Sequence, residues 1–447
     1  MVQPAALGPR EPLPEPLVRR KNGWSSPPRL LMIPLVLLFL SATGCSPSDS
    51  AEVVDSAPVT VFEGARLIDG QGGAPVEDAV LVVREGHFIE VGRRGEVDVP
   101  AGADRVDLSD KTIIPALINT HLHLAQTREA LLDQLEHLAY YGVGVAVSLG
   151  SDSSEVVFQV RDEPVAGAAR LRTAGRGITR PEPGRGEAPY WVDTEDEARA
   201  AVRELAASGV DLVKIWVDDR NGQYEKLTPE LYGAIIDEAH RHDLLVTAHI
   251  FTLEDAKGLL RAGLDAFAHG IRDRDVDDEL LELWRERPHV VLVPNLPDPG
   301  VARDVSWLGG TVPAEQLSEM QATATDRPDA QERFAVQARN LARLNEEGVR
   351  IAFGTDGSAP WSVHLEMANM VSAGMSPAEV IVAATRNSAE LLGLTDAGTV
   401  EEGKRADFVV LDANPLDDIT YTREISAVYL GGVAVDRERL SARWLAN

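Results

Sequence analysis

The sequence predicts an α/β protein: a (β/α)8 TIM barrel with a small β-sandwich domain assembled from both chain ends. Short apolar runs alternate with amphipathic helical runs through residues 113–392, as expected of strands covered by helices on both faces. Two β-rich pieces, residues 58–112 and 393–440, flank this region. A chain of 447 residues suits one large barrel with an accessory part.

The two flanking pieces consist of short strand-like runs. Gly, Asp and Pro punctuate these runs, as turn residues do between strands. The runs are PVTVFEGARLIDG, DAVLVVREGHFIEVG and DRVDLSDKTIIP before the central region, and GTVEEGKRADFVVLDANP and ISAVYLGGVAVD after it. Because both pieces share this pattern of short strands and turn residues, we expect them to form one small sheet domain.

The central region contains eight candidate strands. They are ALINTHLHL, VGVAVSLG, RLRTAGRGI, DLVKIWV, LLVTAHI, DAFAHG, VVLVPNL and VRIAFGTD. Amphipathic runs such as PELYGAIIDEAHRH, LEDAKGLLRAG and DELLELWRER separate several of them. Eight such units fit a closed barrel, and a doubly wound open sheet is the alternative. The sequence contains no G-x-G-x-x-G, P-loop or G-x-S-x-G motif.

The first 45 residues resemble a bacterial lipoprotein signal peptide. A basic stretch at residues 19–29 precedes an apolar run at residues 30–40, which is too short to span a bilayer as a mature helix, and SATGC then ends at Cys45. By this resemblance Cys45 is lipidated after cleavage, and residues 46–57 form a polar tether. We therefore expect an extracytoplasmic lipoprotein held at a membrane only by its lipid anchor, on the periplasmic side if the host has two membranes.

The chain is strongly acidic, with 43 Lys+Arg against 71 Asp+Glu and a formal net charge of −28. This charge repels phosphate backbones, so nucleic acid is not an expected partner. The single cysteine excludes an intramolecular disulfide and a cysteine pair that binds metal. The expected partner is a small-molecule substrate, and the oligomeric state stays open, a homo-oligomer included.

Residues of metal-binding type recur along the candidate strands. In a barrel, reactive side chains lie at the carboxyl ends of the strands. The candidates are His121, His123, Lys214, His249, His269 and Asp356. Each alone has an ordinary explanation, such as a core histidine or a helix-capping aspartate. Their joint occurrence favours a divalent ion such as zinc, because such ions prefer neutral imidazoles and carboxylates.

Lys214 stands inside the apolar run DLVKIWVDD. A lone buried ammonium costs several kcal/mol unless it is paired, neutralised or chemically changed. The side chain could reach the barrel mouth, or it could pair with Asp218 or Asp219.

The order His-x-His, Lys, His, His, Asp, together with DKTIIPALINTHLHL at the entry to the barrel, resembles the binuclear amidohydrolase superfamily. The likeness covers residues from about 58 to 440. GTDGSAPWSVHLEMANMVSAGMSPAEVIVAATRNSAELLGL and GKRADFVVLDANPL resemble the branch that contains imidazolonepropionases and Xaa-Pro dipeptidases. Because imidazolonepropionases of this superfamily are mononuclear and lack the lysine, Lys214 argues against that activity here.

The resemblance implies two divalent metal ions, with zinc as the default. His121 and His123 would bind the more buried ion, and His249 and His269 the more exposed one. Asp356 would be both a ligand and the proton shuttle. A CO2-derived carbamate on Lys214 would bridge the metals, since a buried amine has a lowered pKa and is more often neutral.

The expected activity is hydrolysis of an amide-type C–N bond, in a dipeptide, an N-acyl amino acid or a related small molecule, by a metal-bridging hydroxide. The same site could instead act on a lactone, a carbamate or a phosphotriester. A third hypothesis is a lipoprotein that binds solute or metal without catalysis. Tyr224 and His364 are tentative substrate-binding residues, and Glu366 accompanies His364 after the eighth strand.

The sequence departs from the dipeptidases after Lys214. Leu227 occupies a position where those enzymes carry a tyrosine before the helix-opening Ser or Thr. Trp216, Asp218 and Asp219 would narrow the mouth and oppose a substrate carboxylate. The alternatives are core packing for Trp216 and a solvated turn for the two aspartates.

Overall fold

The computed structural model describes residues 57–446 apart from residues 164 and 358. These residues belong to one compact unit, Ser56–Asn447. The predicted signal peptide at residues 1–45, with Cys45, lies outside the described residues, as does nearly all of the predicted tether at residues 46–57. Within the described part, no helix combines the length and the hydropathy needed to cross a membrane.

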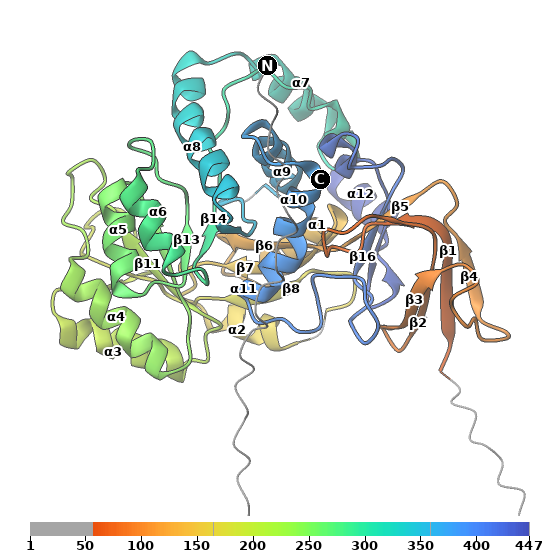
Figure 1. The fold of residues 1–447 in the computed structure, drawn as a ribbon, viewed down its shortest axis with the longest axis horizontal. Coiled ribbons are helices and arrows are strands. Elements are labelled where there is room, and N and C mark those ends of the chain that lie inside the picture. The colour runs from red at the N-terminus through yellow and green to blue at the C-terminus, as the bar shows by residue number, and fades with distance from the viewer. Residues whose placement is uncertain (1–56, 164, 358, 447) are drawn as a thin grey trace, which may run out of the picture. The chain divides into compact units, whose positions relative to one another are not determined.

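Both ends of the chain contribute strands to one sheet. Its strands are β1 (Val59–Leu67), β2 (Val76–Arg84), β3 (His87–Arg93), β4 (Asp104–Asp107), β5 (Thr112–Pro115), β16 (Phe408–Leu411), β17 (Ile425–Leu430) and β18 (Val433–Ala434). Their order is β18-β17-β16-β5-β1-β2-β3, with β4 paired to β1. The antiparallel pair β5 and β16 joins the two ends, and Figure 1 shows orange and blue strands side by side there. The shared sheet was predicted, and its folding into a two-layer sandwich stays a prediction.

Aromatic packing holds the two ends of the chain together in this sheet. The ring of Phe62 on β1 lies 5.0 Å from that of Phe408 on β16 and 4.7 Å from that of Tyr429 on β17, both edge to face. Phe408 and Tyr429 stack with centroids 4.7 Å apart. Such pairs add to the free energy gained from burying the rings.

The central region forms two parallel sheets. The first has the order β6-β7-β8, and the second has the order β10-β9-β11-β12-β13-β14-β15. The strands are β6 (Leu117–Leu122), β7 (Val143–Ser148), β8 (Arg170–Thr173), β9 (Ile178–Thr179), β10 (Tyr190–Trp191), β11 (Val213–Val217), β12 (Val246–Ile250), β13 (Ala266–Ala268), β14 (Val291–Val293) and β15 (Arg350–Ile351). All eight predicted runs contain a strand, and the pairings are parallel as expected.

Backbone hydrogen bonds link the two parallel sheets at both edges. The amide of Asp211, just before β11, donates to the carbonyl oxygen of Thr173 on β8 at 2.9 Å. On the other side, the amide of Thr120 on β6 donates to the carbonyl oxygen of Phe353 at 2.9 Å. The ladders do not form a single closed set of paired strands.

Two strands are shorter than the sequence predicts. RLRTAGRGI splits into β8 and β9 around Gly175, whose φ of +59° is a left-handed conformation that ends a strand. VRIAFGTD pairs only over Arg350–Ile351, and the chain then approaches β6 through isolated hydrogen bonds.

Helices cover the parallel sheets. They are α1 (Arg128–Tyr140), α2 (Glu155–Asp162), α3 (Glu195–Ala207), α4 (Pro229–Arg241), α5 (Leu253–Ala262), α6 (Asp278–Arg285), α7 (Ala314–Thr323), α8 (Pro328–Glu346), α9 (Ser362–Ser372), α10 (Pro377–Val382), α11 (Ser388–Leu391) and α12 (Arg437–Leu445). Shorter turns are the 3-10 helices η1 (Ser306–Gly310) and η3 (Ile419–Arg423) and the π-helix η2 (Ala383–Asn387). The predicted amphipathic runs are α4, α5 and α6, which gather on one side in Figure 1.

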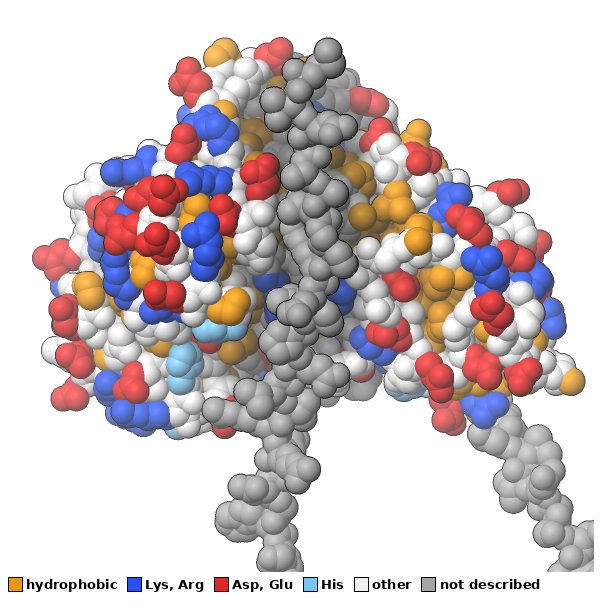
Figure 2. Space-filling model, viewed as in Figure 1, with side chains coloured by type: hydrophobic (Ala, Val, Ile, Leu, Met, Phe, Trp, Pro, Cys, Tyr) orange, Lys and Arg blue, Asp and Glu red, His pale blue; other side chains and the backbone are white. Residues whose placement is uncertain are grey.

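Charges on the outer helices are mixed rather than segregated. Figure 2 shows acidic and basic side chains interleaved over the region of α5 and α6. Arg261 on α5, for example, forms an ion pair with Glu279 on α6, and both side chains are exposed. Such exposed pairs contribute about 0–1 kcal/mol each, so they add little to the stability of the fold.

Candidate metal centre

The six predicted site residues lie on or just beyond parallel strands. His121 is the fifth residue of β6, His123 follows β6, Lys214 is the second residue of β11, His249 is the fourth of β12, His269 follows β13, and Asp356 lies in the loop after β15. Because the strands run parallel, their carboxyl ends face the same side. Lys214 starts deeper in its strand, and its long side chain brings Nζ to 3.4 Å from Nε2 of His121.

Asp356 is the centre of the cluster. Its Oδ1 lies 3.1 Å from Nε2 of both His121 and His123, and its Oδ2 lies 3.5 Å from Nε2 of His269. His121, His269 and Asp356 bring their ligand atoms within 4.8 Å of one another, which is close enough for one metal ion. The amide of Asp356 donates to the carbonyl oxygen of His121 at 2.9 Å and so fixes the loop against β6.

The backbone is strained at two of these residues. Asp356 has a φ of +53° and His269 a φ of +118°, and residues other than glycine rarely adopt such values. Such strain costs about 1–3 kcal/mol per residue and clusters at functional sites. The fold therefore stabilises an unfavourable conformation that turns both side chains into the cluster.

Polar neighbours hold one nitrogen of each ring of the His-x-His pair. Nδ1 of His121 lies 2.6 Å from Nδ2 of Asn295, in the loop after β14. Nδ1 of His123 lies 3.1 Å from Oγ of Ser151, after β7. These contacts orient both Nε2 atoms toward Asp356, as outer partners do for histidines that bind metals.

His249 is oriented by a different neighbour. Its Nε2 lies 3.0 Å from Oδ2 of Asp218, which also accepts from Nη1 of Arg220 at 2.8 Å. The rings of His249 and His269 are 4.5 Å apart, and Nδ1 of His269 is buried without a hydrogen-bond partner among the described residues. The structure thus places His249 beside the cluster but not within the group around Asp356.

Burial keeps these imidazoles neutral. It lowers the pKa of His121 to about 3 and that of His249 to about 4, and it lowers the pKa of His269 well below its ordinary value. Burial alone would raise the pKa of Asp356, but hydrogen bonds to His121 and His123 outweigh it and lower that pKa strongly. The contacts of Asp356 with His121 and His269 therefore join a carboxylate to neutral rings. Neutral imidazole is the form that binds a metal ion.

Lys214 is fully buried. Burial lowers its pKa from 10.5 to about 7, although the charge of Asp356 acts in the opposite direction. No carboxylate among the described residues lies within 4 Å of its Nζ, so neither Asp218 nor Asp219 pairs with it. The nearest polar contact is Nε2 of His121, and the ring centroid of Trp216 is 5.4 Å away.

Trp216 packs beside Lys214 against two glycines. A Cβ atom at Gly177 would lie 2.1 Å from the Trp216 ring, and one at Gly150 would lie 2.6 Å from it and 2.8 Å from Cγ of Lys214. The indole thus fills the space that both glycines leave open and shields the lysine stem from water.

Tyr224 and His364 lie apart from the cluster. The hydroxyl of Tyr224 donates to the carbonyl oxygen of Pro183 at 3.1 Å. His364 is buried on α9, where its Nδ1 lies 3.1 Å from Oγ1 of Thr422 and its ring contacts those of Tyr141 and Trp307 edge to face. Their predicted contacts with substrate gain no support from this geometry.

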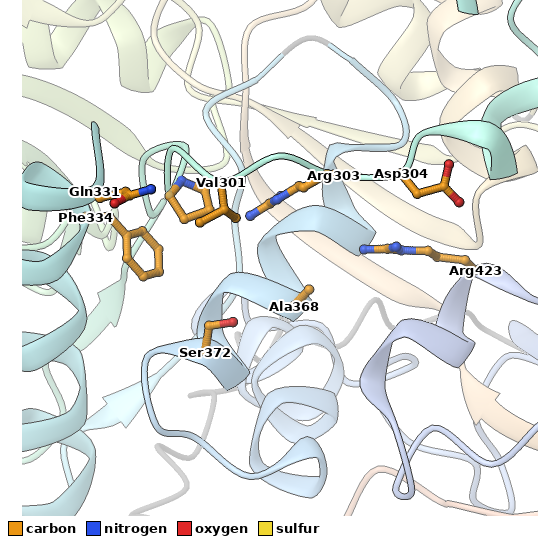
Figure 3. A pocket seen from close by; sticks show the side chains of 9 residues that line it. Val301, Arg303, Asp304, Gln331, Phe334, Ala368, Ser372 and Arg423 are labelled. Atoms are coloured by element: carbon orange, nitrogen blue, oxygen red, sulfur yellow. The ribbon is translucent and has the colours of Figure 1, made fainter. Parts of the chain in front are cut away.

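A cavity of about 260 Å³ opens beside Asp356. Its lining is His269, Arg272, Asn295, Leu296, Pro297, Gln337, Thr355 and Asp356. A second cavity, of about 500 Å³, is lined by residues outside the metal-binding cluster. In Figure 3, Gln331 and Phe334 border it from α8 on one side, and Arg303 and Arg423 lie toward the other.

Glu366, on α9, accepts a hydrogen bond from Leu296, which lines the cavity beside Asp356. Its Oε1 accepts from the amide of Leu296 at 2.9 Å, and burial raises its pKa from 4.5 to about 8. Because the folded pKa exceeds the unfolded one, this group stabilises the fold fully below about pH 4.5, and the stabilisation is lost as the pH rises through 8.

We therefore expect Glu366→Gln to flatten the loss of stability at alkaline pH while keeping the acceptor for Leu296. Chemical unfolding should show equal stability for wild type and variant at about pH 4.5, and a variant that is more stable at about pH 9 by at least about 1 kcal/mol, because the stability of the wild type falls between these two pH values. Glu366→Ala is the control that removes the acceptor. Parallel pH profiles for Glu366→Gln and wild type would refute the assignment.

Sequence reasoning missed the partners of the histidines. Asn295 and Ser151 were not candidates, and Asp218 was considered as a turn or mouth residue or as a partner of Lys214, but not as a partner of His249. Asn295 follows the seventh candidate strand, so a polar residue at a strand end was the available signal for it. The contacts of Ser151 with His123 and of Asp218 with His249 depend on which loops lie side by side in the folded chain.

The fold and the cluster agree with comparisons to known proteins. Residues 112–435 match the model of the amidohydrolase family, so the chain belongs to this family. It is accordingly a hydrolase of carbon–nitrogen bonds, and members of the family generally use divalent metals. This confirms the resemblance drawn from the sequence.

Individual relatives span most of the chain. An imidazolonepropionase from Deinococcus radiodurans is 28% identical over 388 residues, which cover 80% of this chain and 92% of that protein. An ochratoxinase from Aspergillus niger is 27% identical over 440 residues, which cover 84% of this chain and 85% of its own. A solved structure named as a candidate prolidase from Bifidobacterium longum superposes with a TM-score of 0.72 at 27% identity, over 87% of this chain and 99% of that one.

Proposed function

We propose that this protein hydrolyses an amide-type C–N bond of a small molecule, such as a dipeptide or an N-acyl amino acid, at a centre of two divalent metal ions. One observation carries the proposal: the Asp356 carboxylate contacts three imidazoles beside a fully buried lysine. Zinc suits this set of nitrogen and oxygen donors.

The donor atoms fit two ions. Nε2 of His121 and of His123 point to Asp356 and would hold the more buried ion together with it. A metal on Nε2 of His121 requires a proton on Nδ1, and the buried Oδ1 of Asn295, which has no partner, can accept it after a half-turn of the amide. His249 and His269 would hold the second ion, with Nδ1 of His249 free because Asp218 occupies Nε2.

Lys214 would carry the group that bridges the ions. Its lowered pKa leaves a large neutral fraction near pH 7. The neutral amine can attack CO2, which forms an N–C bond and releases one proton to give an anionic carbamate with two oxygens. That reaction removes the cost of a buried ammonium and supplies negative charge for two cations.

Asp356 would move the proton of the reaction. When bound, the two ions supply a deprotonated water as nucleophile and polarise the scissile carbonyl. A carboxylate oxygen of Asp356 accepts the remaining proton and returns it to the leaving nitrogen. The low pKa of Asp356 keeps it ionised across neutral pH.

We propose the following organisation around this centre. Residues 113–392 form one (β/α)8 barrel, supported by the hydrogen bonds that join the two parallel sheets at Thr173 and at Phe353. Residues 58–112 and 393–440 form the composite sandwich, supported by their shared sheet. The carboxyl ends of the parallel strands then surround the cavity beside Asp356.

Turnover on a mixed panel tests the substrate class. The metal-loaded protein is assayed with dipeptides, N-acyl amino acids, lactones and phosphotriesters, and hydrolysis of the amides is expected to be the fastest. Relatives named as prolidase and ochratoxinase support amides. Cleavage of esters alone would favour the alternative of a lactonase or phosphotriesterase, and tight metal binding without any turnover would favour a non-catalytic binding protein.

We also propose that the protein is a lipoprotein anchored through Cys45. Support comes from the basic, apolar and SATGC segments of the N-terminus. Labelling of the expressed protein with a fatty acid should modify wild type but not Cys45→Ser. Labelling of both would contradict the assignment.

A further inference from the structure

Arg272 lies in the cavity beside Asp356 without a counter-ion. Among the described residues, no carboxylate lies within ion-pairing distance of its guanidinium, and its Nε is buried without a hydrogen-bond partner. Asp273, next in the chain, pairs instead with Arg274 at 2.7 Å. The guanidinium of Arg272 lies 5.9 Å from the ring centroid of Phe251.

Arg272 is a partly buried cation without a partner among the described residues, although the chain does not lack acids to pair with it. Burial of a charge without a partner costs several kcal/mol. The sequence contains 71 Asp+Glu, and burial lowers the pKa of Arg272. A guanidinium kept in this state is expected to have a partner that arrives with the ligand.

Other polar atoms of the cavity wall are also unsatisfied. Oε1 of Gln337, from α8, and Oδ1 of Asn295 are buried without a hydrogen-bond partner among the described residues. Both side chains line the same cavity as Arg272, together with the apolar Leu296 and Pro297. One side of the cavity is thus the predicted metal centre, and another offers a cation and amides next to an apolar surface.

We propose that Arg272 is a specificity-determining residue that binds a free carboxylate of the substrate. The proposal rests on the function proposed above and narrows it: the substrate is an N-acyl amino acid or short peptide whose carboxylate lies close to the scissile bond. The guanidinium offers paired N–H donors that match a carboxylate, and this pairing would place the carbonyl next to Asp356 and His269. Neutral amides, lactones and phosphotriesters lack the group that it binds.

The acidic residues near the mouth do not oppose such a substrate. Asp218 was expected from the sequence to repel a carboxylate, but its charge is compensated by Arg220 at 2.8 Å, and its Oδ2 orients His249. Asp219 uses Oδ1 to accept from the amide of Gly222 in a turn. The cavity itself therefore presents Arg272 as its cationic group opposite the single carboxylate of Asp356.

Equilibrium binding to the metal-loaded protein tests this proposal without turnover. The probes are N-methanesulfonyl-L-leucine and its carboxamide, which differ at the carboxylate and carry a sulfonamide in place of the amide that the proposed reaction cleaves, and calorimetry compares wild type with Arg272→Met and Arg272→Lys. We expect wild type to bind the acid roughly 10- to 100-fold more tightly than the amide, Arg272→Met to lose this preference, and Arg272→Lys to retain part of it. Arg274→Met, which removes an exposed arginine two residues further on, is the matched control and should behave as wild type.

The proposal is overturned if wild type binds the two probes equally or binds neither of them. It is also overturned if Arg272→Met keeps the wild-type preference while its metal content and melting temperature are unchanged. A merely structural arginine would weaken both probes alike, and this too counts against it. A carboxylate preference that depends on Arg272 in a protein that cleaves no amide would contradict the proposed function and not this subsite.

Discussion

Lys214→Ala is expected to lower kcat/KM by roughly 10³-fold or more and to reduce the number of bound metal ions. The physical reason is the position of the Lys214 amine within the cluster. Nζ is buried 3.4 Å from Nε2 of His121, with no carboxylate partner among the described residues, so its removal takes away the group proposed to become the bridging anion. Metal analysis after gel filtration and steady-state kinetics on an N-acyl amino acid measure both effects.

Lys111→Ala is the matched control, because Lys111 lies in the other sheet and pairs with Asp412 at 2.7 Å. It should keep wild-type turnover and metal content. Added bicarbonate should speed the activation of metal-free wild type by promoting the carbamate, and it should have no effect on Lys214→Ala. Wild-type activity together with full metal content in Lys214→Ala would refute the role of this lysine.

Asp356→Asn is expected to lower kcat by roughly 10²- to 10⁴-fold, the usual contribution of a positioned general acid or base. The carboxylate is ionised because the neighbouring imidazoles lower its pKa, whereas an amide at this position can neither take nor return a proton. The variant also loses an anionic oxygen near three imidazoles, so weaker metal binding should accompany the loss of rate. Kinetics at saturating metal separates the two effects.

Asp219→Asn is the control for Asp356→Asn. It removes one acidic charge from a loop near the mouth, where Oδ1 only accepts from the amide of Gly222. It should retain activity within a few-fold of wild type. If Asp356→Asn at saturating metal turns over as fast as wild type, another group must move the proton.

The sequence predicted the residues of the cluster better than the neighbours that orient them. His121, His123, His269 and Asp356 could be predicted because strand ends in an α/β fold converge, and the structure does bring them together. Lys214 was recognisable as anomalous because a charge in an apolar strand needs a reason.

The residues that sequence reasoning could not place act across large separations. Asn295 contacts His121 from 174 positions away, and Asp218 holds His249 from 31 away. These contacts depend on the conformation of loops, which strand periodicity does not encode. The split of one predicted strand at Gly175 has the same origin, since a positive φ is a local backbone choice that apolar patterning does not show.

Arg272 shows the same limit in another form. In the sequence it is one of several charges in a run that reads as a solvated helix face, RDRDVDDELLELWRER. Only the structure separates it from Arg274, which is exposed and paired with Asp273. Arg272 instead lines the cavity beside Asp356.

Titration of chelator-treated protein with zinc, with hydrolysis of an N-acyl amino acid followed at each addition, tests the two-metal account most directly. The account predicts no activity without metal, and activity that reaches its maximum only near two equivalents per chain. Full activity in the metal-free protein, or a plateau at one equivalent, would contradict it.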